Sequence, residues 1–212
     1  MNGELLAELG VASGTPVLPS CGETGEPTSA QGLGLSEDVA AVRRVLTASD
    51  EPTVVVAHSY GGIVTAEAAA GVDGVRHVLL VSSYLPEVGQ SLSSFAGEEP
   101  APFLDIDPEG GTFTVRPEAL AETFLQDCGP EIQRQATDKT ARQSLAVLEQ
   151  PVRSAAWQHV ASTYLVCAED LGTPAERQRG FARRAGSVVE LDAGHHPFLS
   201  RPAAVRDLVL SL

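Results

Sequence analysis

One stretch of the chain decides the fold: Val54-Val55-Val56-Ala57-His58-Ser59-Tyr60-Gly61-Gly62. The run of valines predicts a strand over 53–57, and a helical pattern over 61–70 follows the serine. A strand that turns into a helix through a serine with small neighbours is typical of a nucleophile elbow, in which the serine sits on a strained turn. Ala57, in place of the usual first glycine, and Gly61 are expected to give that turn its clearance. Ser59 is therefore the candidate nucleophile, and the backbone N–H of Tyr60 is the candidate oxyanion donor.

The regions on both sides of this stretch alternate between short β-branched runs and helical patterns, which indicates βα units around a mostly parallel sheet. Ser36, followed by Glu37 and Asp38, predicts the N-terminus of a helix over 36–48. Residues 84–116 contain several Pro and Gly and are expected to be irregular. The other expected elements are a strand over 77–82, helices over 117–125 and 131–148, a strand over 162–167, a helix over 174–184, a strand over 187–191 and a helix from 202.

This order predicts an α/β core made of two blocks, residues 1–83 and 161–212, with a mainly helical insertion between them. The insertion covers residues 84–160. Ligands bind at the carboxyl ends of the strands in such sheets, so an insertion at that edge would form a lid.

A nucleophilic serine needs a histidine base and a carboxylate that orients it, in the chain order Ser, then Asp or Glu, then His. His195 comes directly after the strand over 187–191, and Gly194 gives its loop the freedom to reach Ser59. The alternative base, His196, precedes Pro197, which restricts its backbone to extended conformations, and it is expected to pack or to face solvent.

The carboxylate is expected in the loop after the strand over 162–167, where Glu169 and Asp170 are adjacent. We select Asp170 and expect Glu169 to face solvent. Asp192 is a competitor, but it lies too close to His195 in the chain for an easy orienting hydrogen bond. The candidate catalytic residues are therefore Ser59, Asp170 and His195.

At these motifs the sequence resembles the α/β-hydrolase superfamily, in the branch of plant-type methylesterases, hydroxynitrile lyases and bacterial esterases. The resemblance runs from about Leu5 to the C-terminus. It is carried by the segments 57–62 (AHSYGG), 162–170 (STYLVCAED) and 194–202 (GHHPFLSRP). Within the insertion, 122–128 (ETFLQDC) and 155–157 (AAW) are similar in character. The resemblance implies the same three catalytic residues and a lid over an apolar pocket.

The chain departs from this family at its start. Members of the family open with a strand and a His-Gly loop whose backbone N–H completes the oxyanion hole, followed by a helix. Here Leu5, Leu6, Leu9 and Gly10 resemble the last turns of that helix. Three explanations stay open: a start downstream of the true one, a chain that pairs or rearranges to fill the gap, and a degraded homologue.

Composition limits the partners. The 14 basic and 28 acidic residues give a formal charge of −14, which disfavours nucleic acid and membrane surfaces as partners. The start of the chain shows no pattern of a secretory signal, and the three cysteines, Cys21, Cys128 and Cys167, are unclustered. We therefore expect a cytoplasmic protein without metal or cofactor, with a small-molecule ester as its substrate and a homodimer as a candidate assembly.

The expected reaction is hydrolysis of a small, largely apolar carboxylic ester through an acyl-enzyme. Tyr60, Phe124 and Trp157 are the candidate substrate-binding residues, with packing inside the insertion as the alternative role of Trp157. Two other functions stay open. One is carbon–carbon cleavage of the hydroxynitrile lyase kind, which needs a nearby cation, although Lys139 is the only lysine. The other is ligand binding without turnover, because the oxyanion loop is missing.

Overall fold

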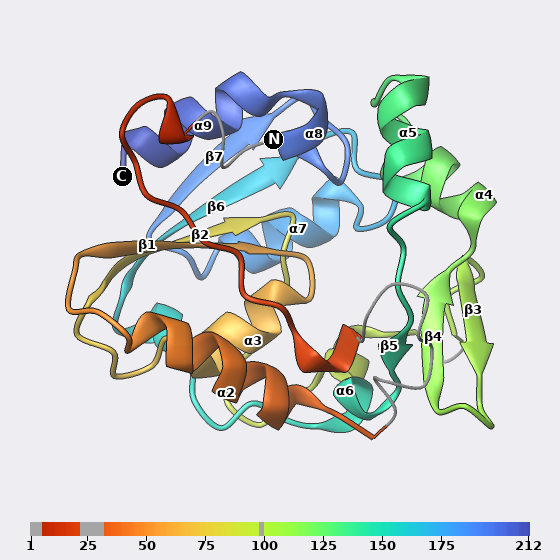
Figure 1. The fold of residues 1–212 in the computed structure, drawn as a ribbon, viewed down its shortest axis with the longest axis horizontal. Helices are drawn as coiled ribbons and strands as arrows, with labels where there is room; N and C mark the ends of the chain where they lie inside the picture. Colours follow the sequence, from red (N-terminus) through yellow and green to blue (C-terminus); the bar gives the residue numbers. More distant parts are fainter. Residues whose placement is uncertain (1–5, 22–31, 98–99) are drawn as a thin grey trace.

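A sheet of four parallel strands, in the order β1-β2-β6-β7, forms the centre of the fold (Figure 1). The computed structural model describes residues 6–21, 32–97 and 100–212. The strands are β1 (Thr53–His58), β2 (Val75–Val81), β6 (Ala161–Cys167) and β7 (Ser187–Leu191). The helix α3 (Gly61–Ala68) connects β1 to β2, and α7 (Ala175–Ala182) connects β6 to β7. The predicted strands and their parallel arrangement are confirmed.

Side chains that alternate along the strands build two separate layers of core. Val78 and Leu80 of β2 pack in the cluster formed with α2 (Leu35–Leu46), α3 and α7. Leu79 and Val81 of the same strand pack in the second cluster, against α9 (Pro202–Leu210). The two central strands, β2 and β6, are thus covered on both faces, as their continuous apolar runs require.

The strand that carries the elbow lies at the edge of this sheet. Among the described residues β1 pairs with β2 alone, and Val56 is 47% exposed. A strand of mostly valine would normally be covered on both sides.

The helix α2 differs from its prediction at its start. It begins at Leu35 with Gly34 as N-cap, so Ser36 lies inside the first turn and does not cap the helix. The Gly34 N–H donates to Glu37 Oε2 at 2.8 Å. The acidic pair Glu37 and Asp38 does occupy the first turn, as predicted.

The segment that connects β2 to β6, which we call the inserted segment, contains a small antiparallel sheet that the sequence did not predict. Its strands are β3 (Leu104–Asp107), β4 (Thr112–Val115) and β5 (Gln143–Ser144). The β3–β4 turn is closed by a hydrogen bond from the Gly110 N–H to Asp107 Oδ1 at 2.9 Å, and Gly111 has a φ of 62°. Alternating side chains on both sides of this Gly-Gly turn are the signal of the hairpin.

The predicted helix over 131–148 is also broken. Its first part is α5 (Pro130–Thr137), its end is α6 (Ala146–Glu149), and β5 lies between them because its backbone pairs with β4. The remaining short helices are η1 (Pro19–Cys21), η3 (Leu92–Phe95), α4 (Pro117–Ala119), the π-type η4 (Leu120–Phe124), η5 (Ala156–Gln158) and α8 (Pro197–Ser200). Within the described ranges, none of the helices has the length and apolar character needed to cross a membrane.

Candidate active site

The carboxyl ends of the four parallel strands bring the candidate residues to one edge of the sheet. Ser59 follows β1, Ser82 follows β2, Asp170 follows β6 by three residues, and His195 follows β7 by four. Such an edge is where ligands bind in open α/β sheets. The topology therefore gathers side chains that are up to 136 residues apart in the chain (195 − 59 = 136).

Ser59 has the strained backbone of an elbow, with a φ of 50°. Its carbonyl holds that conformation, because it accepts the Gly62 N–H at 3.1 Å, the Tyr84 N–H at 3.3 Å and the Ser83 hydroxyl at 2.8 Å. A non-glycine residue with positive φ costs of order 1–3 kcal/mol and persists only where its surroundings enforce it. The elbow is thus fixed by its neighbours.

The glycine that this turn requires is Gly62, not Gly61. A Cβ on Gly62 would lie 2.0 Å from the Tyr84 carbonyl oxygen and 2.3 Å from Ser83 Oγ. A Cβ on Gly61 would meet only Ala57 Cβ, at an ordinary contact distance of 4.0 Å. The expectation that Gly61 gives the turn its clearance is wrong, because the close approach comes from the chain after β2.

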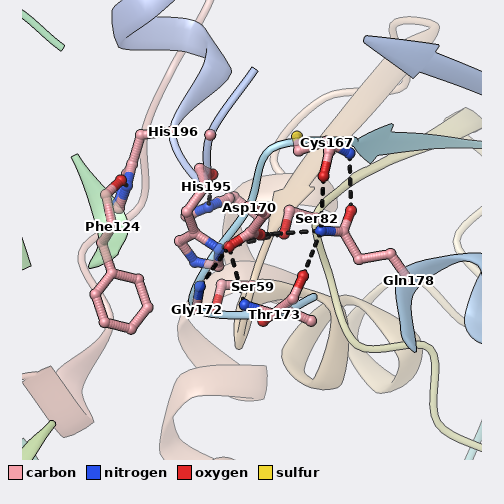
Figure 2. Close-up of polar contacts among 12 residues, drawn as sticks. Ser59, Ser82, Phe124, Cys167, Asp170, Gly172, Thr173, Gln178, His195 and His196 are labelled. Carbon is pink, nitrogen blue, oxygen red and sulfur yellow. Dashed lines mark hydrogen bonds and ion pairs between the residues drawn. The ribbon is translucent and has the colours of Figure 1, made fainter. Parts of the chain in front are cut away.

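Asp170 and His195 form a buried pair. His195 Nδ1 lies 2.7 Å from Asp170 Oδ2, and the two residues are 3% and 4% exposed (Figure 2). Burial would raise the pKa of the Asp170 carboxyl, but hydrogen bonds from His195, Ser82 and the backbone N–H of Thr173 hold it below its usual value. Asp170 is therefore kept ionised and orients the imidazole. Of its sequence competitors, Glu169 and Asp192 are exposed.

Two residues that the sequence analysis missed complete the shell of Asp170. Ser82, 1% exposed and with a φ of 40°, donates its hydroxyl to Asp170 Oδ2 and lies 3.2 Å from His195 Nδ1. Gln178 of α7 is fully buried, and its Nε2 donates to Asp170 Oδ2 at 3.0 Å. Its Oε1 accepts the Cys167 N–H at 2.9 Å, which ties α7 to the end of β6. No sequence signal pointed to either residue, since both depend on the packing of α7 and β2 against the loop.

The His58 side chain contacts the loop that carries His195. His58, the residue before Ser59, has its Nε2 2.8 Å from the His195 carbonyl oxygen, and its ring packs against His195, His196 and Phe198. This contact joins the residue before Ser59 to the loop that carries His195. Figure 2 draws Ser59 and the Asp170–His195 pair in one close-up. Burial, together with the electrostatic effect of the neighbouring imidazoles of His195 and His196, lowers the pKa of His58 well below its usual value.

His196 lies next to the pair but makes other contacts. Its Nδ1 is 2.9 Å from the Phe124 carbonyl oxygen. Burial is the main cause that lowers the pKa of His196 to about 4, and the neighbouring His195 is the second. His196 is therefore neutral at pH 7.

The inserted segment reaches this site through Phe124 and Asp127. The Phe124 ring packs edge-on against the His195 imidazole, with 5.0 Å between centroids, and a Cβ on Gly172 would lie 2.3 Å from that ring. Asp127 Oδ2 accepts the Gly194 N–H at 2.7 Å. A Cβ on Gly194 would lie 2.5 Å from Asp127 Oδ1, so a side chain at this position would displace the carboxylate.

The side chains of Tyr60 and Trp157 make hydrogen bonds to residues outside the Asp170–His195 pair. The Tyr60 hydroxyl donates to Asp38 Oδ2 at 2.8 Å, although its backbone N–H makes no hydrogen bond to any residue that the structure describes. The Trp157 Nε1–H donates to the Pro86 carbonyl at 2.7 Å, and the ring lines a small cavity with Gly62 and Leu85. Of the three candidate substrate-binding side chains, Phe124 is the one in contact with His195.

The described residues contain no cluster of three or more His, Cys, Asp or Glu side chains able to hold a metal ion. Burial raises the pKa of the Cys167 thiol to about 12, so this cysteine is a protonated core residue.

The comparisons with known proteins identify the class. Residues 5–208 match the alpha/beta hydrolase family, and the chain belongs to that family. It is 28% identical over 187 residues to the alpha/beta hydrolase nvfD of Aspergillus novofumigatus, covering 80% of this chain and 74% of the relative.

Solved structures share the fold. A pyrethroid hydrolase from Sphingobium faniae superposes with a TM-score of 0.84 at 20% identity, covering 98% of this chain and 88% of that one. Polyneuridine aldehyde esterase superposes with a TM-score of 0.83 at 21% identity, covering 99% and 91%. The family and the fold predicted from the sequence are thereby confirmed, and the chain is a hydrolase of this family.

Proposed function

We propose that the protein is a serine hydrolase that cleaves a small, largely apolar carboxylic ester through an acyl-enzyme. The observation that carries this proposal is that a strained elbow serine and a buried Asp170–His195 pair follow the carboxyl ends of strands of the same parallel sheet. The esterase and hydrolase relatives support the same class of reaction.

The geometry supports a definite division of roles. Asp170 holds Nδ1–H of His195, which leaves Nε2 free to accept the proton of the Ser59 hydroxyl as its oxygen attacks the ester carbonyl. The Tyr60 N–H lies at the N-terminus of α3 and makes no hydrogen bond within the described part of the chain, and it would donate to the oxyanion that forms. His195 would then protonate the leaving alcohol and activate the water that releases the acid.

The walls of the site support an apolar substrate. Phe124 packs on the His195 ring, and Phe103 packs on Phe124 with 5.1 Å between centroids. Both come from the inserted segment, which we propose acts as a lid over Ser59. A ring wall favours substrates that bury alkyl or aryl groups.

The contacts support ester hydrolysis over a lyase reaction that needs a cation beside the histidine. The residue after His195 is the neutral His196, and Lys139, the only lysine, is exposed. A developing cyanide anion would therefore find no fixed positive charge from either residue.

The test is hydrolysis of p-nitrophenyl acetate, butyrate and octanoate by the wild type and by Ser59→Ala, His195→Ala and Asp170→Asn. We expect each variant to lose about 10³-fold or more in kcat/KM, because the three residues act as a unit. Equal rates for wild type and Ser59→Ala would overturn the proposal and favour a ligand-binding homologue. Cyanide release from an aromatic cyanohydrin without ester hydrolysis would favour the lyase.

A further inference from the structure

A second buried carboxylate lies behind the elbow. Asp38 of α2 is fully buried, and its oxygens accept the Ser20 N–H at 2.8 Å, the Ser20 hydroxyl at 2.5 Å and the Tyr60 hydroxyl at 2.8 Å. No basic side chain of the described residues forms an ion pair with it. Burying a carboxylate without a cation costs several kcal/mol unless hydrogen bonds satisfy its oxygens. Three donors from two residues do this at Asp38.

Tyr60 connects this carboxylate to the elbow. It follows Ser59 directly, its ring packs on the main core cluster, and its hydroxyl points to Asp38. Its N–H has no hydrogen-bond partner among the described residues. The direction of that N–H depends on the backbone between Ser59 and Gly61, which has the positive φ of Ser59 at its start. Because the Tyr60 hydroxyl is bound to Asp38, the side chain limits the conformations that the Tyr60 backbone can adopt. Burial and the Asp38 charge raise the pKa of Tyr60, so the phenol remains a donor.

Ser20 extends the connection to the inserted segment. Gln143 Nε2, on β5, donates to Ser20 Oγ at 3.1 Å. In Figure 1 the orange-red turn of η1 lies beside β5, and η1 contacts both α2 and β5. The path Tyr60–Asp38–Ser20–Gln143 therefore joins the elbow to the antiparallel sheet of the insertion.

We propose that Asp38 is a positioning residue of the site: it anchors the Tyr60 phenol and thereby fixes the backbone N–H that meets the oxyanion. This inference rests on the proposed function. It assigns Tyr60 a side-chain role that differs from substrate contact, since its hydroxyl is directed to Asp38 and not to His195.

The experiment measures the rate at which a fluorophosphonate labels Ser59, together with kcat and KM for p-nitrophenyl butyrate. The proteins are the wild type, Tyr60→Phe, Asp38→Asn and the double variant. We expect each single variant to lose about 10-fold in labelling rate and in kcat with KM within twofold, because the oxyanion contact exists only in the transition state. The double variant should be no slower than the slower single variant, because both changes break one link.

Val205→Ala serves as the control for lost stability, because it creates a cavity under α9 in the second core cluster. We expect this variant to have a lower thermal midpoint and a wild-type labelling rate. Tyr60→Phe keeps the test decisive if Asp38→Asn fails to fold, since it removes one oxygen and leaves Asp38 with the two Ser20 donors.

The two failures are distinguishable. A wild type that labels at Ser59, with Tyr60→Phe labelling equally fast, overturns the role of Asp38 and leaves the proposed function intact. A wild type that is not labelled overturns the proposed function and this inference together.

Discussion

At the scale of single residues, steric room at the elbow is set by the chain after β2. Gly62 sits against the Tyr84 carbonyl, whereas Gly61 has space for a methyl group. The Tyr84 N–H and the Ser83 hydroxyl donate to the Ser59 carbonyl, and these hydrogen bonds hold Ser59 at its positive φ. Two adjacent glycines of one motif thus have different physical tasks.

We predict that Gly62→Ala lowers the stability by about 1–3 kcal/mol, the usual cost of overpacking, and reduces ester hydrolysis by about 100-fold because Ser59 is displaced. Gly61→Ala is the matched control. Its stability should stay within about 0.5 kcal/mol of the wild type, and its rate of ester hydrolysis within about twofold. Urea unfolding and initial rates measure the two effects. The opposite order of the two variants would contradict this account of the elbow.

At the scale of elements, the π-type helix η4 of the inserted segment places an aromatic side chain against the catalytic histidine candidate. Its last residue, Phe124, is 9% exposed and touches His195, and its backbone carbonyl contacts His196. From the sequence, Phe124 is one of three candidate substrate-binding residues, with Tyr60 and Trp157. The structure was needed to show that Phe124, and not Trp157, contacts His195, because the two rings lie on different parts of the inserted segment.

We predict that Phe124→Ala lowers kcat/KM for p-nitrophenyl octanoate by about 10-fold or more, mainly through KM, because an apolar contact of about 1.5–3 kcal/mol is lost. The effect on the acetate should be within about threefold. Phe103→Ala is the control, since Phe103 packs on Phe124, and its effect should be smaller. Equal losses for both esters would show that Phe124 does not contact the acyl chain.

Much of the central sheet could be predicted because its strands are continuous apolar runs that end in turn residues. The hairpin β3–β4 and the strand β5 could not, because two- and four-residue strands depend on their partners more than on their own pattern. At the site, Asp170 and His195 stood out by their place after strands. Ser82, Gln178 and Asp38 did not, because their roles come from burial and from contacts distant in the chain.

At the scale of the whole molecule, ring packing around the site connects stability to pH. The folded-state pKa of His196 is lowered to about 4, while the unfolded value is near 6.5. Between these values the unfolded chain binds a proton that the folded chain does not, so the free energy of unfolding falls as the pH is lowered. The contribution of neutral His196 to the free energy of unfolding is complete above pH 6.5 and is lost on acidification toward pH 4. His58 acts in the same direction.

We predict that His196→Asn, which keeps a donor for the Phe124 carbonyl, makes the free energy of unfolding less dependent on pH between 6.5 and 4. Denaturant unfolding at several pH values measures the slope, which should fall without reaching zero because His58 remains. Comparing the two proteins cancels the opposing effect of Asp38, whose pKa is raised by burial. Identical slopes would contradict a neutral, packed His196.

The central claim, that Ser59 is an activated nucleophile, is tested most directly by intact mass spectrometry after fluorophosphonate treatment. The geometry predicts a single adduct on the wild type and none on Ser59→Ala, with a strongly slowed reaction in Asp170→Asn, where the imidazole loses its orienting carboxylate. An unmodified wild type, or an adduct that persists in Ser59→Ala, would contradict it.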